Sequence, residues 1–241
     1  MSLPSNSSLK YFPDNKAANF KVKTPYFTDS NAMYECALTE IIFPNRFKNV
    51  RDNSNEIIVY QCNVKTGIEY KIESCYYPTI DSLIKKINEV VTSNVSITFD
   101  KVEERTRVTV SGGYCVHFGS DIARLLGFPS DNLIKSIDNN EVSKVSPYHA
   151  TPTGGLSTVY VYTDIIKQQI VGETSTPLLR IVNWNHSSKE DNTALIFEKL
   201  YFIPLKNSQF DVINILLLDD TGKEIAFEYG KVLVVLEFRK V

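Results

Sequence analysis

Short runs of β-branched, aromatic and aliphatic residues recur along most of this 241-residue chain, and turn-forming residues separate them. Runs of this kind predict strands, and together they predict about ten to a dozen. Only two segments show the three- and four-residue spacing of an amphipathic helix. A parallel α/β fold, which needs a helix after most strands, is therefore excluded. We expect an all-β chain, a jelly-roll β-sandwich with two short helices inserted in connections.

The stretch from residue 159 to 182 shows the pattern most clearly. Its two ends are rich in Val, Ile, Leu and Tyr, and residues 172–177 supply turn chemistry between them. A strand that begins at Phe20 contains Pro25, which confines it to a sheet edge. The other predicted strands lie at 34–43, 56–64, 68–72, 95–99, 106–110, 114–118, 194–205, 210–218, 224–229 and 231–238.

The first predicted helix follows Pro78. Its apolar residues recur at helical spacing up to Val91, Thr79 is the expected N-cap, and Asp81 lies in the first turn, where the helix dipole favours a negative charge. We expect its apolar face to pack on a sheet. The second predicted helix, in SDIARLLGF at 120–128, has Ser120 as its expected cap and Gly127 at its end.

We expect a flexible amino-terminal arm over residues 1–19 and a single jelly-roll domain over residues 20–241. The arm contains few large apolar side chains before Tyr11 and Phe12. Residues from about 129 to 156 are polar and rich in turn residues, which predicts a long loop. We interpret this segment as a loop and not as a domain boundary, because the strand-rich parts on its two sides would each be small and open-edged alone.

The net charge is −2, from 26 basic and 28 acidic residues, and no long run of one sign occurs. Because nucleic-acid grooves usually depend on an excess of positive charge, we expect no specific nucleic-acid partner. No apolar run approaches the roughly 18 to 20 residues that span a bilayer, so we expect no membrane association. The first ten residues lack the order of a secretion signal.

The four cysteines, Cys36, Cys62, Cys75 and Cys115, include no C-x-x-C pair. Without a secretion signal, we interpret them as buried or half-buried free thiols. Cys115 and His117 share one face of a predicted strand, but two ligands do not make a metal site. The sequence therefore nominates no metal ligand and no cofactor-binding residue.

One motif points toward catalysis. Asp220, Thr221 and Gly222 follow an apolar run, as in retroviral-type aspartic proteases, where two carboxylates share a proton. That fold needs a flap and closing strands after the motif, and only 19 residues follow Gly222. We interpret the motif as a hairpin turn between 210–218 and 224–229. The other nucleophile, metalloprotease and phosphate-loop motifs are absent from the sequence, so we expect no enzyme and name no catalytic residue.

Three ordered blocks from residue 159 onward carry a family resemblance. They read VYVYTDIIKQQIVGETSTPLLRIV, LYFIPLKNSQFDVINILLLDDTG and IAFEYGKVLVVLEFRK. Together they resemble the carboxyl-terminal half of the penton, or minor capsid, proteins of Maverick/Polinton-type elements, adintoviruses and virophages. YYPTIDSLIKKIN and SDIARLLGF resemble the same family more loosely. The chain departs from the family in the loop NWNHSSKEDN, which contains Trp184 and His186.

The resemblance implies a structural protein of a virus-like shell. Such proteins form homopentamers at the fivefold vertices of an icosahedral capsid that is built mainly from a double-jelly-roll major capsid protein. The expected partners are therefore other copies of this chain and that major capsid protein. The expected location is the virion capsid, assembled inside the host cell.

The same blocks nominate the residues of a subunit interface or family motif, which are Tyr162, Asp164, Gln169, Gly172, Pro177, Arg180, Gly230 and Arg239. For Gly172, Pro177 and Gly230, backbone geometry alone is an alternative explanation. Asp164 and Arg180 carry opposite charges and could pair with each other or across subunits.

Three alternatives to the capsid role stay open at this stage. A jelly roll of lectin or cupin type would be a ligand- or glycan-binding module without catalytic activity, although the predicted strands lack the clustered His and Glu ligands of cupins. A cryptic protease would depend on Asp220. A viral gene captured by a host would have a role that its ancestry does not define.

Overall fold

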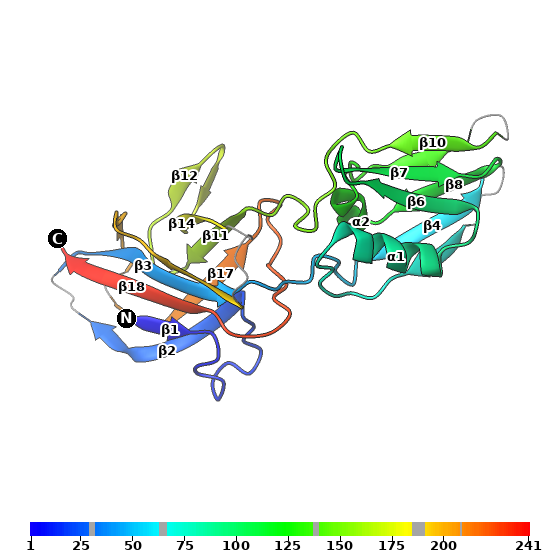
Figure 1. The fold of residues 1–241 in the computed structure, drawn as a ribbon. Helices are drawn as coiled ribbons and strands as arrows, with labels where there is room; N and C mark the ends of the chain where they lie inside the picture. The colour runs from blue at the N-terminus through cyan, green and yellow to red at the C-terminus, as the bar shows by residue number, and fades with distance from the viewer. Residues whose placement is uncertain (29–31, 63–66, 137–139, 185–190, 208) are drawn as a thin grey trace. The chain divides into compact units, whose positions relative to one another are not determined.

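The computed structural model describes the chain except for residues 29–31, 63–66, 137–139, 185–190 and 208. Two compact units make up the chain (Figure 1): one joins Met1–Phe47 to Leu156–Val241, and the other is Lys48–Gly155. The second is inserted in the sequence of the first, and we call it the inserted unit. This differs from the expected single domain over residues 20–241.

Most strands of the first unit lie in two antiparallel sheets. One has the order β1 (Ser2–Pro4), β18 (Leu233–Lys240), β3 (Tyr34–Pro44) and β15 (Asn192–Ile196), with β16 (Ile203–Pro204) also paired to β3. The other has the order β14 (Leu178–Asn183), β11 (Thr158–Thr163), β17 (Gln209–Leu218) and β2 (Asn19–Thr28). We call them the β3 sheet and the β11 sheet.

The order of these strands identifies the fold. Counting along the chain only the eight strands just listed, without β16, the β3 sheet holds the first, eighth, third and sixth strands, and the β11 sheet holds the second, seventh, fourth and fifth. This wrapped alternation between two sheets is the order of an eight-stranded jelly roll. The predicted all-β, jelly-roll fold is therefore confirmed.

Alternation along the strands, interrupted at β-bulges, builds the core of the sandwich. Most inward positions of β11, β17, β3 and β18 are buried. They include Val159, Val161, Ile213, Ile215, Leu217, Ile41, Phe43, Val234 and Leu236. Trp184 packs against this core. The centroid of its ring lies 5.0 Å from that of Phe43 and 5.1 Å from that of Phe47.

The amino-terminal segment differs from the flexible arm expected over residues 1–19. β1 pairs with β18, Leu3 is only 1% exposed in the core, and the Met1 amine donates to the Leu236 carbonyl. A strand of three residues with one buried side chain is too short to produce a periodic signal in the sequence, which explains the difference.

Pro25 was expected to confine its strand to a sheet edge, and β2 does lie at the edge of the β11 sheet. Two side chains from the preceding segment cover part of this edge. The Lys21 amide donates to Asn15 Oδ1 at 2.9 Å, and the Lys23 amide donates to Ser8 Oγ at 2.9 Å. Covered edges are protected from adding a foreign strand.

The inserted unit has a core of its own. One sheet has the order β5 (Ile68–Lys71), β4 (Glu56–Gln61), β8 (Tyr114–Phe118) and β9 (Leu133–Lys135), and the other has the order β10 (Val142–Val145), β7 (Arg105–Val110) and β6 (Val95–Asp100). The expected hairpin of 56–64 with 68–72 is present as β4 and β5, although residues 63–66 lie outside the described part. Strands β9 and β10 fall within the loop predicted at about 129–156.

Both helices belong to the inserted unit. In α1 (Ile80–Val90), Thr79 and Ser82 form a reciprocal capping box, and Ile80, Leu83, Ile84 and Ile87 are buried, with the helix contacting β6 as expected. In α2 (Ser120–Leu125), the N-cap is Gly119 and not Ser120. Gly127 follows α2 with a φ of +78°, where a Cβ would lie 2.3 Å from the Tyr148 carbonyl oxygen, so only glycine fits.

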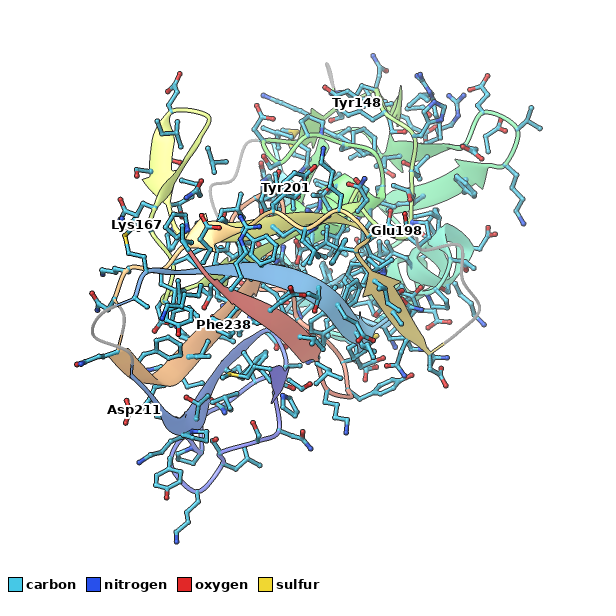
Figure 2. All side chains as sticks on the ribbon, turned by 90° about the vertical axis from the view of Figure 1, so that its left-hand side faces the viewer. Tyr148, Lys167, Glu198, Tyr201, Asp211 and Phe238 are labelled. Atoms are coloured by element: carbon cyan, nitrogen blue, oxygen red, sulfur yellow. A yellow bond between two sulfur atoms is a disulfide. The ribbon has the colours of Figure 1, made fainter. Side chains whose placement is uncertain are left out.

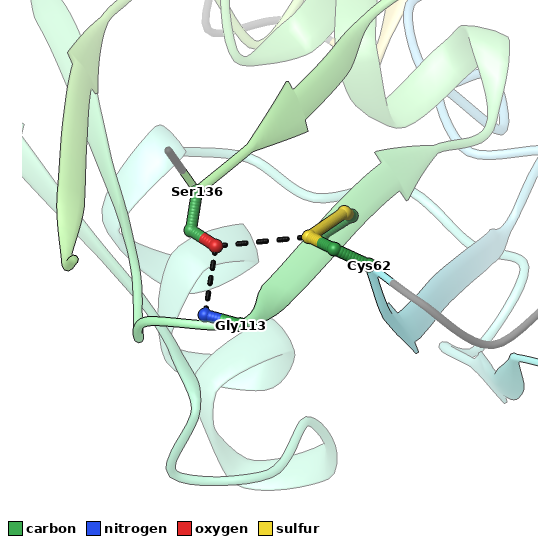
Figure 3. Close-up of a disulfide and its surroundings, with 4 residues drawn as sticks. Cys62, Gly113 and Ser136 are labelled. Carbon is green, nitrogen blue, oxygen red and sulfur yellow. Dashed lines mark hydrogen bonds between the residues drawn. A yellow bond between two sulfur atoms is a disulfide. The ribbon is translucent and has the colours of Figure 1, made fainter. Parts of the chain in front are cut away.

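The cysteines correct one expectation. Cys62 and Cys115 form a disulfide with their Cα atoms 5.9 Å apart (Figure 3), while Cys36 and Cys75 remain thiols. Pairing of β4 with β8 brings the two cysteines together, since Tyr60 lies opposite Cys115. Because the two cysteines are 53 residues apart, the sequence alone does not show that they are neighbours in the fold. The Ser136 hydroxyl lies 3.6 Å from Cys62 Sγ and accepts a hydrogen bond from the Gly113 amide.

The Asp-Thr-Gly motif lies in a turn, as expected. The turn is organised by the preceding residue, because Asp219 Oδ1 accepts from the amides of Thr221 and Lys223, both at 2.9 Å. After the turn, the predicted strand at 224–229 is reduced to isolated bridges, Leu218 with Glu224 and Phe47 with Phe227. Within the described residues, the helices are too short and too polar to cross a membrane.

A buried asparagine ties together the two ends of the inserted unit. Asn49 is 2% exposed, and its amide nitrogen donates to the carbonyl oxygens of Tyr77 at 2.8 Å and Pro152 at 2.7 Å. Nearby, the Arg51 guanidinium donates to both carboxylate oxygens of Asp121, which is 1% exposed. The entry and exit segments are thus fixed by contacts inside the unit.

We therefore expect residues 48–155, expressed alone, to fold cooperatively. Replacement of Asn49 by Ala should lower the free energy of unfolding of this fragment by about 1–3 kcal/mol, because the buried Tyr77 carbonyl and the partly buried Pro152 carbonyl lose their donor. Circular dichroism and urea titration measure both effects. A fragment without a cooperative transition would contradict the expectation, and Lys85→Ala, an exposed change on α1, serves as the control.

The disulfide should stabilise the chain by up to about 4 kcal/mol, the chain-entropy limit for a loop of this length. We expect reductant to lower the urea midpoint of the inserted unit in the full chain, and to have no effect on a Cys62→Ser variant. Equal midpoints for the wild type with and without reductant would count against a stabilising cross-link.

Candidate assembly surface

The outward side of the β11 sheet is unusually apolar. In most sandwiches the outward positions of the strands are polar. Here Tyr160 lies opposite both Ile181 and Leu218, and Tyr162 lies opposite Leu216. These five residues form a continuous surface across three strands, which we call the tyrosine face.

The tyrosine face remains open to solvent in the described chain. Ile181 is 48% exposed, and the other four side chains are half-buried. Burial raises the pKa of the Tyr162 phenol, and the neighbouring Tyr160 adds to this shift. The Tyr162 phenol therefore stays neutral. Tyrosine side chains combine an apolar body with a hydrogen-bonding tip, a combination that is frequent in protein interfaces.

Asp164 and Arg180, a candidate pair, do not contact each other. Asp164 follows β11, is exposed, and accepts a hydrogen bond from the Asn214 amide at 2.9 Å through Oδ1. Arg180 lies in β14, where its guanidinium carbon is 3.7 Å from the Phe197 ring centroid and Nη1 donates to the Lys199 carbonyl at 3.0 Å. Of the two alternatives for this pair, an ion pair within one chain is not present between these described residues, and pairing across subunits stays a prediction.

The structure instead brings Arg180 and Arg239 to the same segment. Residues 197–202, FEKLYF, connect β15 to β16, and we call them the aromatic strap. Arg180 comes from the β11 sheet and lies over Phe197 and Tyr201, while Arg239 comes from the β3 sheet and lies 3.9 Å from the centre of Phe202. Desolvation lowers the pKa of Arg180, and Tyr201 acts in the opposite direction. Figure 2 labels Tyr201 and Glu198 on this strap.

Arg239 also forms an ion pair with Glu35 in the β3 sheet. Its guanidinium Nη2 lies 2.6 Å from Glu35 Oε2, and the two residues are cross-strand partners on β18 and β3. The two arginines thus fix the strap to both sheets of the sandwich. We assign them a structural role that the family resemblance did not specify.

Gln169 and Gly172 belong to a separate hairpin between β11 and β14. It consists of β12 (Gln169–Val171) and β13 (Thr174–Thr176) and projects from the sandwich, with Lys167 at its foot (Figures 1 and 2). Ile170 is 87% exposed. Gly172 has a φ of +59° at the turn, and a Cβ there would meet nothing within 4 Å, so backbone conformation alone explains this glycine.

Pro177 and Gly230 also have local explanations. The Pro177 carbonyl accepts a hydrogen bond from the Thr163 amide at 3.2 Å, at the β-bulge between β11 and β14. Gly230 has a φ of +90°, and a Cβ would approach Pro44 Cγ to 2.8 Å. Both residues shape the chain around the strands and present little side chain to a partner.

Of the eight nominated residues, only Tyr162 belongs to the tyrosine face. The sequence did not single out Ile181, Leu216 and Leu218 as surface residues, because their strands are apolar on both sides. Trp184 is buried in the core, and His186 lies outside the described residues. Across the part of the chain that the structure describes, no group of three or more His, Cys, Asp or Glu side chains is placed to hold a metal ion.

No protein-family model matches the sequence, and no curated protein matches it. Among solved structures, the mavirus penton protein aligns with 100% of this chain and 98% of its own, at 11% identity and a TM-score of 0.49. The flagellar cap protein FliD of Escherichia coli, domains D2 and D3, aligns with 98% of this chain and 97% of its own, at 12% identity and a TM-score of 0.25. At these values, neither likeness assigns a function to this chain.

We expect Arg180 and Phe197 to be energetically coupled. Arg180→Lys keeps the charge but loses the planar stack, and Phe197→Leu keeps an apolar side chain but loses the ring. A double-mutant cycle on the free energy of unfolding should give a coupling energy of about 0.5–1 kcal/mol. The exposed pair Lys71→Gln and Glu69→Gln is the control, with a coupling near zero. Additive effects of Arg180→Lys and Phe197→Leu would contradict the stacking role.

Proposed function

We propose that this chain is a capsid vertex protein that forms homopentamers at the fivefold vertices of an icosahedral shell. The observation that carries the proposal is the tyrosine face on a complete jelly roll. It lies within and next to the sequence block that resembles the penton proteins of Maverick/Polinton-type elements, adintoviruses and virophages. The proposed partners are other copies of the chain and a double-jelly-roll major capsid protein, and the proposed location is the virion capsid.

The tyrosine face supports self-assembly on physical grounds. A contiguous outward surface of two tyrosines, two leucines and an isoleucine is characteristic of an interaction site and is unusual for a free monomer. Tyrosine is enriched in the buried centres of protein interfaces, and the other three side chains can pack tightly without charge. The proposed role is structural and requires no catalytic group.

Native mass spectrometry of the full chain, alone and then with a candidate major capsid protein, tests the proposal. We expect a species of roughly 137 kDa, five times the chain mass of 27.3 kDa, in at least one of the two conditions. The Leu216→Arg variant should lose this species, because it places a charge within the tyrosine face, opposite Tyr162. Val102→Arg, at a residue that is 93% exposed in the inserted unit, is the matched control.

A chain that forms no fivefold species in either condition would overturn the proposal. A stable monomer that ignores the major capsid protein and binds sugars on a glycan array would instead favour the ligand-binding jelly-roll module.

A further inference from the structure

The outward side of the β3 sheet is also largely apolar, and its charged side chains include two glutamates. Leu233 of β18 lies opposite Ile42 of β3, and Val235 lies opposite Glu40, which in turn faces Ile196 of β15. Ile196 is 76% exposed. Glu237 continues the outward row of β18. We call these six residues, Leu233, Ile42, Val235, Glu40, Ile196 and Glu237, the glutamate face.

The two carboxylates of the glutamate face have no ion-pair partner among the described residues. Glu40 is half-buried between apolar neighbours, and Glu237 is exposed. The salt bridge of Arg239 with Glu35 lies on the same side of this sheet, two residues along β18 from Glu237, and neither Glu40 nor Glu237 takes part in it. An apolar surface that holds unpaired negative charge fits a partner surface that is apolar and positive.

The tyrosine face has such positive charge at its flank. Lys21 and Lys23 occupy outward positions of β2, opposite Asn214 and Val212 of β17. Neither lysine forms an ion pair within the described chain; Lys23 lies 4.5 Å from the centre of the Tyr11 ring. One carboxylate lies in the same outward row, because Asp164 is hydrogen-bonded to the amide of Asn214, the residue opposite Lys21.

We propose that the tyrosine face of one copy packs on the glutamate face of the next, with Lys21 and Lys23 opposite Glu40 and Glu237. The proposal rests on the proposed function, because it specifies the contact that closes the ring. The two faces lie on opposite sides of one sandwich, so a single copy cannot bring them together. A contact between different faces is heterologous and can repeat from copy to copy around a ring.

A twofold dimer fits the charges less well. The tyrosine face packed on itself would bury lysines without an opposing glutamate, and the glutamate face packed on itself would oppose carboxylates to carboxylates. Each arrangement would leave like charges in a poorly solvated contact, which disfavours it relative to the mixed contact. The partner that satisfies both faces is therefore a second copy of this chain in a head-to-tail orientation.

Charge reversal of each face, singly and together, tests the proposal at low ionic strength. Lys21→Glu with Lys23→Glu, and separately Glu40→Lys with Glu237→Lys, should each raise the concentration at which the five-copy species forms by about tenfold or more. The variant that carries all four changes should recover assembly to within about threefold of the wild type, since the signs are then opposite again. Lys85→Glu with Lys135→Glu, two exposed lysines of the inserted unit, should have no effect.

Cross-linking of the unaltered protein provides a second measurement that does not depend on how the variants fold. A carbodiimide joins amines to carboxylates at contact distance, and a mixture of light and ¹⁵N-labelled chains identifies links between copies. We expect links between copies that join Lys21 or Lys23 to Glu40 or Glu237. Links from these lysines only to other carboxylates would overturn the proposed contact.

The outcomes separate the two proposals. A wild-type chain that forms no five-copy species, alone or with the major capsid protein, overturns the vertex role and the contact with it. The contact alone is overturned if the five-copy species persists in both charge-reversed double variants. It is also overturned if the variant with all four changes folds but does not recover the five-copy species. In either case the vertex role remains intact.

Discussion

The antiparallel pairing of β3 with β18 is the contact on which the rest of the structure depends. It joins the strand before the inserted unit to the last strand of the chain, and it supplies the centre of a sheet whose remaining strands add to its two sides. The sheet therefore cannot form until both segments of the jelly roll are present. Such long-range pairing is slow to form, because its loop-closure entropy is lost before its contacts are gained. The inserted unit shortens the effective loop between β3 and the later strands, because its own Asn49 holds its two ends together.

Much of this fold could be predicted from the sequence, because the signals for strands and helices are local. The alternation at 231–238 and the capping residues of α1 correspond to elements in the structure. The division into two units could not be predicted, since both boundaries lie in ordinary turn-rich sequence. The disulfide of Cys62 and Cys115 depends on which strands are neighbours, and periodicity carries no information about that.

The interface candidates show the same limit. Gly172 and Gly230 are explained by their positive φ angles. A glycine in a sequence block can indicate such an angle, but it does not indicate whether a partner subunit lies nearby. Arg180 and Arg239 were nominated by the family resemblance, but the aromatic rings that they contact lie in a connection whose position depends on both sheets. The tyrosine face was hidden for a different reason: in strands that are apolar on both sides, the sequence alone cannot distinguish an outward leucine from an inward one.

The free energies of apolar burial and of ion pairing indicate which residues of the two faces would supply affinity and which would supply selectivity. Burial of a leucine, isoleucine or tyrosine side chain contributes about 1.5–3 kcal/mol, whereas an ion pair at an exposed rim contributes about 0–1 kcal/mol. Apolar burial would therefore supply the affinity of a contact between copies, and the lysines and glutamates would select which face meets which. All of these residues belong to 1–47 and 156–241, and none comes from the inserted unit. Substitutions in the inserted unit can therefore accumulate without altering a residue of either face.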